Sequence, residues 1–169
     1  MLLFVAAAFF ERAPGGFFGR VRPFAAAVSG GLVSRVHDGD TVTLALAGGG
    51  TVMARLYGLD APELKQPYGQ AARRFLREKV EGRTVRLEER ERDQYGRAVA
   101  LLFVEGEAVS LNEMMLVSGQ AWVYRRYCDA EFCAAWLAAE KEARKNKLGL
   151  WRDKKPVPPW QWRRRHPRP

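Results

Sequence analysis

The sequence predicts an α+β fold, mainly β, in which a five-stranded barrel carries about three helices. Three observations predict it. Short segments of alternating apolar and polar residues recur between residues 32 and 104, a segment with helical spacing separates the first three from the last two, and glycine-containing turns follow several of them. With 169 residues, the chain is long enough for one domain with one sizeable core.

The first three strands are expected at residues 32–37, 41–46 and 51–59. The second of them alternates cleanly between apolar and polar residues, and the glycines of 48–50 form a turn before the third. Pro62 ends the third strand, because proline cannot donate to a strand ladder. These segments predict a meander of three neighbouring strands.

A helix at residues 68–80 follows, with apolar residues at helical spacing and Gly82 just beyond its end. The remaining elements are expected as strands at 84–90 and 97–104, a helix at 111–118, a brief strand at 121–124 and a helix at 130–147. In that last helix Asp129 is the expected N-cap, and the residues expected to face the core are Phe132, Trp136, Leu137 and Leu148. Five main strands with a helix after the third are typical of a small closed barrel of the OB type.

Charge and composition exclude some functions but select none. The formal net charge is +9, of which six charges come from residues 151–169, so the rest of the chain is only mildly basic. Two histidines and two cysteines disfavour histidine-rich zinc sites, nucleases built on paired histidines and Cys-ligated metals. No segment is long and apolar enough to span a bilayer.

The sequence divides into three regions. Residues 1–28 are an N-terminal extension whose apolar start has the length of a signal-peptide core, although no basic residue precedes it. Residues 29–153 form the barrel domain, and residues 154–169 are a basic tail rich in Pro, Trp and Arg. The tail either packs back on the barrel through Trp160 and Trp162 or holds a polyanion electrostatically.

Four polar clusters fall at strand ends or turns, where a barrel builds its binding surface. They are Asp38-Gly39-Asp40-Thr41, Arg55, Asp60-Ala61-Pro62-Glu63 and Asp93-Gln94-Tyr95-Gly96-Arg97. Each cluster alone has an ordinary structural explanation as a turn, a helix cap or an ion pair. Their joint occurrence, in this order and at these spacings, is much more specific.

These clusters resemble the thermonuclease (staphylococcal nuclease-like) family, and the resemblance runs from about Ser29 to Asp153. It also includes Tyr68-Gly69-Gln70, Leu111-Asn112, Gly119 to Tyr124 and Gly149-Leu150-Trp151. The family implies a nuclease that uses Ca²⁺ to cut phosphodiester bonds in DNA or RNA. A non-catalytic nucleic-acid-binding or protein-binding module on the same barrel is the alternative. Retention of all the carboxylates and arginines favours the enzyme.

The resemblance also implies a role for each matching residue. Asp40 and Asp60 match the carboxylates that hold Ca²⁺, and Ala61 matches the residue whose carbonyl joins them. Glu63 matches the residue that activates water, and Arg55 and Arg97 match the arginines that grip the phosphate. Three tyrosines are weaker candidates for contact with the nucleotide: Tyr95, Tyr124 and Tyr127.

One departure from the family concerns Ala61, since its best-known member has Thr at this position. If only the carbonyl binds the metal, Ala serves equally well. Asp38 is expected either behind the metal ligands or only in the turn, and His37 is left out of the chemistry.

Such residue types suit phosphodiester hydrolysis. Ca²⁺ is a hard cation that prefers oxygen ligands, and arginine donates paired N–H groups to phosphate oxygens. The arginines stabilise most where charge accumulates, in the five-coordinate transition state.

Cys128 and Cys133 are close enough in sequence for a disulfide, with two buried thiols as the alternative. A disulfide and a need for calcium both favour a secreted or periplasmic location over a cytoplasmic one. We also expect a monomer.

Overall fold

A computed structural model describes residues 28–128 and 130–167 of the chain. The strands are β1 (Val28–Val36), β2 (Thr41–Leu46), β3 (Thr51–Leu56), β4 (Leu59–Asp60), β5 (Thr84–Arg92), β6 (Ala98–Val104) and β7 (Trp122–Val123). The helices are α1 (Gly69–Val80), α2 (Leu111–Val117), α3 (Ala130–Lys145) and α4 (Pro159–Arg165), with short 3-10 turns at Arg125–Tyr127 and Gly149–Arg152. The predicted N-terminal extension, apart from Val28, and the Asp129 cap lie outside the described residues.

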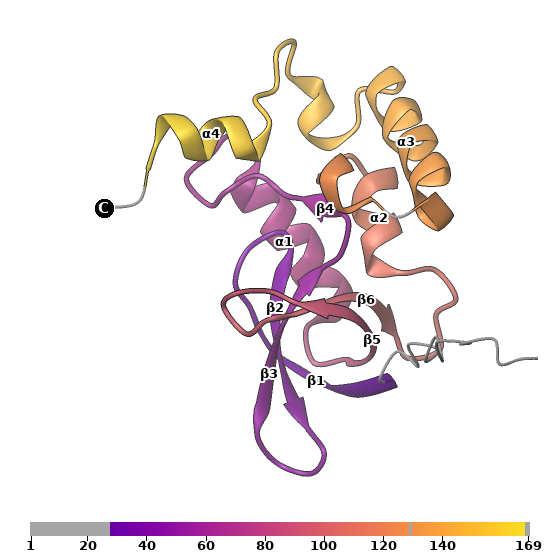
Figure 1. Ribbon diagram of the computed structural model, residues 1–169. Helices are drawn as coiled ribbons and strands as arrows, with labels where there is room; N and C mark the ends of the chain where they lie inside the picture. Colours follow the sequence, from indigo (N-terminus) through magenta and orange to yellow (C-terminus); the bar gives the residue numbers. More distant parts are fainter. Residues whose placement is uncertain (1–27, 129, 168–169) are drawn as a thin grey trace, which may run out of the picture.

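Five strands close into a barrel in the order β1-β2-β3-β6-β5, with β5 pairing back onto β1 (Figure 1). All pairs are antiparallel except β3 and β6, which run parallel with Arg55 opposite Val99. In sequence, α1 lies between the barrel strands β3 and β5. A parallel pair needs such a long connection between its strands, and α1 is part of the connection from β3 to β6. The predicted fold class, a five-stranded barrel of OB type, is confirmed.

The barrel core forms because alternate residues of each strand point inward. Val42 and Leu44 of β2 and Val85 and Leu87 of β5 are almost completely buried. Leu76 of α1 is fully buried in the same apolar cluster. The core thus joins the barrel strands to α1 and fixes where the strand ends lie.

A second layer, made of α2, α3 and the two-stranded sheet β4–β7, packs beside the barrel (Figure 1). Buried Asn112 of α2 connects the layers: its amide nitrogen donates to the carbonyls of Tyr57 and Ala100 at 3.0 and 3.2 Å, and its side-chain oxygen accepts from the Leu102 N–H at 3.1 Å. One of these bonds satisfies the backbone carbonyl of Tyr57, which lies just before β4, and so helps to fix the position of Asp60.

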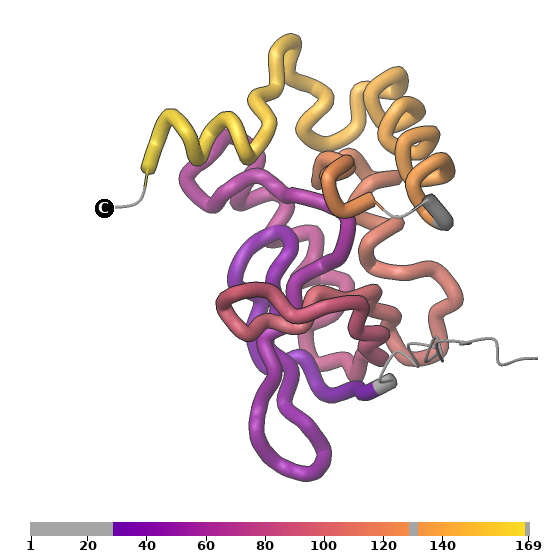
Figure 2. Tube along the Cα trace, in the orientation of Figure 1, coloured from indigo at the N-terminus to yellow at the C-terminus, as the bar shows by residue number. Residues whose placement is uncertain are grey.

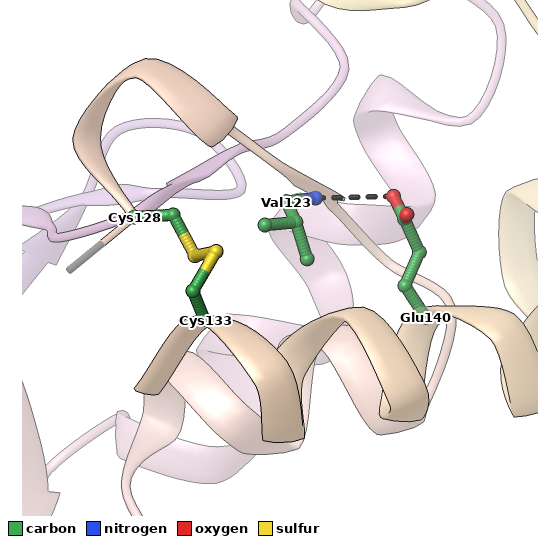
Figure 3. The surroundings of a disulfide bond; sticks show 4 residues. All are labelled: Val123, Cys128, Cys133 and Glu140. Atoms are coloured by element: carbon green, nitrogen blue, oxygen red, sulfur yellow. Dashed lines mark hydrogen bonds between the residues drawn. A yellow bond between two sulfur atoms is a disulfide. The ribbon is translucent and has the colours of Figure 1, made fainter. Parts of the chain in front are cut away.

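A disulfide joins Cys128 to Cys133 at the start of α3, with the two Cα atoms 5.1 Å apart (Figure 3). Further along α3, the carboxylate of buried Glu140 accepts the backbone N–H of Val123 at 3.1 Å. The disulfide and this hydrogen bond fasten α3 to the segment around β7. Since β7 pairs with β4, α3 also supports the strand that carries Asp60.

Most elements begin or end within a few residues of the predicted bounds, and β1 starts four residues earlier, at Val28; three larger differences stand out. The third strand ends at Leu56, because Gly58 adopts a left-handed conformation (φ +72°) and turns the chain into the separate strand β4. Leu148, which was expected in the core, is 38% exposed, so that expectation is wrong. The helix α4 was not predicted, and the C-terminal segment that contains it runs back past the start of α1 (Figure 2).

Candidate functional site

Two aspartates from separate turns converge on one arginine. Asp40 precedes β2, and Asp60 ends β4; both are almost fully buried. Arg55 of β3 donates through Nη1 to Asp40 Oδ1 at 2.8 Å and through Nη2 to Asp60 Oδ1 at 2.9 Å. The two carboxylates predicted to share one cation therefore lie on either side of a single guanidinium group.

Backbone pairing explains this convergence. The Asp40 carbonyl accepts the N–H of Leu56, and Thr41 pairs with Arg55 across β2 and β3. The Asp40 carboxylate also accepts the Thr41 hydroxyl at 2.8 Å and the Ala61 N–H at 3.1 Å. These contacts lock the carboxylate of Asp40 in one orientation and hold the 60–63 segment against it.

The donors at this site fit a hard cation in chemical type, since Asp40, Asp60 and the carbonyl of Ala61 offer only oxygen. Within residues 28–128 and 130–167, no three His, Cys, Asp or Glu side chains gather as a ready metal cluster. The aspartates are compensated by guanidinium groups instead. A cation at this site would take over charge compensation that arginines now provide.

Burial and the Asp40 carboxylate both act on the pKa values of two neighbouring aspartates. Burial raises the pKa of Asp60, and the nearby Asp40 carboxylate adds to the rise, while its arginine partners act in the opposite direction. Burial and the Asp40 carboxylate likewise raise the pKa of Asp38 to about 7. The Oδ1 of Asp38 accepts the backbone N–H of Asp40 at 3.0 Å. This contact places Asp38 in the turn directly before Asp40, and its relation to a bound metal stays a prediction.

Glu63 lies in the loop between β4 and α1. Its backbone N–H donates to the side-chain oxygen of Gln66, and its carbonyl accepts the Gln66 N–H at 2.8 Å. Gly69 starts α1 so close to this loop that a Cβ there would lie 1.9 Å from the Glu63 carbonyl oxygen. The Tyr68-Gly69 motif thus has a steric reason, because only glycine lets the helix approach the loop that carries Glu63.

Arg163 of α4 is the site residue that the sequence did not reveal. It donates through Nη2 to Asp60 Oδ2 at 2.7 Å, and through Nη1 to Asp60 Oδ1 at 3.0 Å and Glu63 Oε1 at 2.9 Å. It stands about 100 positions beyond its partners, within a run of three arginines that resembles an ordinary basic tail. A single sequence gives no signal that would separate it from Arg164 or Arg165.

Arg97, the second predicted phosphate arginine, lies in the turn between β5 and β6. Its Nε donates to Asp93 Oδ2 at 2.7 Å, and the Asp93 carboxylate also accepts the N–H groups of Tyr95 and Arg97. The strands β3 and β6 are parallel neighbours, and Arg55 lies opposite Val99. Arg97 precedes Val99 by two positions in the sequence. In a regular strand this places Arg97 on the same face as Arg55, one strand away.

The three tyrosines occupy different surroundings. Tyr95 is 75% exposed at the tip of the β5–β6 turn, with the guanidinium of Arg97 over its ring. Tyr124 packs between Tyr127 and Trp160, with ring centroids 5.3 and 5.6 Å away. The structure therefore groups Tyr124 and Tyr127 with α4 and leaves Tyr95 beside Arg97.

His37, for which the sequence predicts no role in the chemistry, directly follows β1. Its Nε2 is hydrogen bonded to the hydroxyl of Thr43 at 2.7 Å, on the neighbouring strand. Burial lowers its pKa, and Arg35 and Arg73 add to this effect.

Comparisons with known proteins identify the family of this chain. A family model described as "Staphylococcal nuclease homologue" matches residues 53–153. An "uncharacterized endonuclease" of Escherichia coli O157:H7 is 38% identical over 135 residues, which cover 80% of this chain and 85% of that protein. The "micrococcal nuclease" of Shigella flexneri is 36% identical over 144 residues, covering 79% of this chain and 80% of the relative. An "uncharacterized endonuclease" of Haemophilus influenzae is 34% identical over 132 residues, covering 78% and 71%. The chain therefore belongs to the staphylococcal nuclease homologue family, as the motifs of its sequence predicted.

Proposed function

We propose that this protein is a calcium-dependent nuclease that hydrolyses phosphodiester bonds of DNA or RNA. The observation that carries the proposal is the bridge that Arg55 makes between Asp40 and Asp60, at 2.8 and 2.9 Å. It brings two buried carboxylates and a guanidinium group together. A cation would need the carboxylates as ligands, and a phosphate would need the guanidinium group as a hydrogen-bond donor. Relatives named as nucleases support the same reaction.

Asp40, Asp60 and the carbonyl of Ala61 would hold Ca²⁺. When bound, this ion supplies a Lewis acid that withdraws charge from a phosphate oxygen. The protein contributes the fixed orientation of Asp40, whose carboxylate is held by Thr41 and the Ala61 N–H. Ca²⁺ tolerates such a mixed oxygen site because it does not demand strict geometry.

Arg55 and Arg97 would bind the phosphate from neighbouring strands. Each guanidinium donates paired N–H groups, so that the two residues orient the phosphate and stabilise the charge of the five-coordinate transition state. Arg97 is already held by Asp93, which limits its conformations before the substrate arrives. This preorganisation reduces the entropy lost on binding.

Glu63 would orient the attacking water and accept its proton. Tyr95 beside Arg97, and the pair Tyr124 and Tyr127, would contact the nucleotide. Contacts to sugar and phosphate carry no base code, so we expect little sequence specificity.

The test is a nuclease assay on supercoiled plasmid DNA and on single-stranded RNA, with calcium, with EGTA, and with EGTA followed by excess calcium. We expect cleavage that EGTA abolishes and calcium restores, and the Asp60→Asn variant should be inactive. Conversion of the plasmid to open circles would identify endonuclease action. Cleavage that continues in EGTA would overturn the calcium dependence, and binding without cleavage would favour the non-catalytic module.

We further propose that the protein works outside the cytoplasm as a monomer. The Cys128–Cys133 disulfide supports the location, because such bonds persist in oxidising compartments. Every residue proposed for the site lies in the barrel domain or in α4, so the proposed chemistry needs no second copy of the chain. Among the helices that the structure describes, none has the length and apolar character to cross a membrane. Alkylation without reductant should leave the intact mass unchanged, and light scattering should give about 19.1 kDa; two alkylated thiols or a dimer mass would contradict these proposals.

A further inference from the structure

The C-terminal helix α4 places a positive charge inside the proposed cation site. Arg163 contacts both carboxylate oxygens of Asp60 and one of Glu63, all at 2.7–3.0 Å. Together with Arg55 it leaves neither oxygen of Asp60 without a hydrogen-bond donor. A guanidinium group has no acceptor and cannot bind a cation, and its positive charge opposes a cation at the same carboxylate, so Ca²⁺ would compete with Arg163 for Asp60.

Packing at the start of α4 holds the helix in this position. Pro159 is buried, and the ring of Trp160 lies against Trp122, with centroids 5.8 Å apart. Trp122 of β7 pairs with Asp60 of β4. The contact that holds α4 in place is therefore made by the strand next to the proposed metal ligand Asp60. Arg163 follows Trp160 by three positions, which puts both side chains on one face of the helix.

A second contact ties α4 to the Glu63 loop. The side-chain nitrogen of buried Gln66 donates to the carbonyl of Val157 at 2.6 Å, just before the helix. The prolines at 158 and 159 restrict the backbone at this entry. The placement of Arg163 therefore follows from packed and hydrogen-bonded neighbours, which distinguishes it from a freely moving basic tail.

We propose that α4 is an autoinhibitory segment, in which Arg163 takes the place of the cation at Asp60 and Glu63 and has to withdraw before Ca²⁺ binds. This inference rests on the proposed function of the site. The side chain of Arg163 is 38% exposed, so it can leave toward solvent without unpacking the barrel. Calcium then binds only the fraction of molecules in which Arg163 has withdrawn, and its apparent affinity is reduced by that fraction.

The experiment measures calcium affinity by isothermal titration calorimetry on the full chain. Arg163→Ala should tighten calcium binding about tenfold, as expected if about a tenth of wild-type molecules have Arg163 withdrawn. Arg164→Ala is the matched control, because it removes the same charge from the next residue of α4, which is exposed. We expect its calcium affinity to stay within about twofold of wild type, since an exposed charge is screened.

A second variant tests the anchor and leaves Arg163 in place. Trp160→Ala removes the ring that packs on Trp122 and Tyr124, so it should also tighten calcium binding, by less than Arg163→Ala does. A thermal melt of each variant verifies that the barrel is folded before titration.

The outcomes separate this inference from the proposed function. Equal calcium affinity in wild type, Arg163→Ala and Arg164→Ala overturns autoinhibition and leaves the metal site standing. Weaker binding in Arg163→Ala also overturns it, because Arg163 would then support the site. Absence of calcium binding from all folded variants overturns both proposals together.

Discussion

Arg55 and Arg97 are proposed for the same task, yet the protein holds them in opposite ways. Arg55 lies within the barrel wall, its side chain only 20% exposed, between two aspartates that are almost fully buried. Arg97 lies in a turn with its side chain similarly exposed, at 23%, and is held by one carboxylate, Asp93, whose own side chain is 19% exposed. The two arginines therefore differ in their partners: Arg55 compensates two carboxylates that the fold has buried, whereas Arg97 compensates one carboxylate that is partly exposed.

This difference predicts which arginine is also structural. Removal of one partner from a buried ion pair leaves an uncompensated charge, which costs far more than the loss of a surface pair. Variants of Arg55 should therefore mix effects on stability with effects on catalysis. Variants of Arg97 should report on catalysis alone, which makes Arg97 the better probe of the proposed reaction.

The largest combined effect is expected for Arg55→Ala. It should abolish measurable cleavage and lower the free energy of unfolding without calcium by about 3 kcal/mol, the lower end for a broken buried pair, because Arg163 still compensates Asp60. Urea denaturation with and without calcium measures this, and calcium should recover part of the lost stability. An unchanged unfolding midpoint would mean that Arg55 is not needed to compensate the aspartates.

Arg97→Ala should lower turnover by about 10²–10³-fold, as expected for the loss of one donor to the transition state. Its thermal midpoint should stay close to that of wild type, because Arg97 lies at a turn and outside the core. Single-turnover kinetics at saturating substrate measure the loss, with Arg92→Ala on the same hairpin as the control. Near-normal turnover would remove Arg97 from the mechanism.

Glu63→Gln should slow cleavage by about 10²-fold, since amide nitrogen and oxygen cannot accept a proton as a carboxylate does. Calcium affinity should not weaken, because Glu63 is not proposed as a direct ligand. Calorimetry and the plasmid assay on the same preparation separate the two effects. Loss of calcium binding in this variant would move Glu63 into the set of metal ligands.

The smallest effect is expected for Asp93→Asn, which keeps the shape of the turn and removes the charge that holds Arg97. Turnover should fall about threefold to tenfold, less than in Arg97→Ala, because the guanidinium remains but is less restricted. A fall as large as that of Arg97→Ala would show that Asp93 does more than orient Arg97.

The same variant gives a pH test. Burial raises the pKa of Asp93, but hydrogen bonds from Arg97 and from the N–H groups of Arg97 and Tyr95 outweigh it and lower the pKa below 3.8. Asp93 therefore stabilises the fold above pH 3.8, and this contribution, at most about 1 kcal/mol for a surface pair, is lost as the pH falls below that value. Acid unfolding of Asp93→Asn should be less steep below pH 4 than that of wild type.

Most of the barrel could be predicted from the sequence, because alternating strands and glycine turns are local signals. The alternation of residues 41–46 predicted β2 with its bounds unchanged. Leu148 was misplaced because helical periodicity does not reveal that α3 ends at Lys145, before this residue is reached. The Cys128–Cys133 disulfide stayed one of two alternatives, because spacing alone does not determine the distance between two Cα atoms.

The candidate site also contains residues that could be predicted from the sequence and one that could not. Asp40, Arg55, Asp60 and Glu63 could be predicted as site residues, since each belongs to a short motif that resembles the family, and the structure brings Asp40, Arg55 and Asp60 together. Arg163 could not, because its partners are distant in sequence and its helix depends on the packing of Trp160 against Trp122.

By itself, the sequence determined the family, the order of the elements and the acidic and basic motifs, because strand alternation and turn chemistry act over a few residues. Only the tertiary structure decided that Arg55 lies between two buried aspartates and that α4 brings a second arginine to Asp60. Charge compensation in a buried site depends on which groups lie within about 3 Å of one another, and that proximity arises only when distant segments pack together.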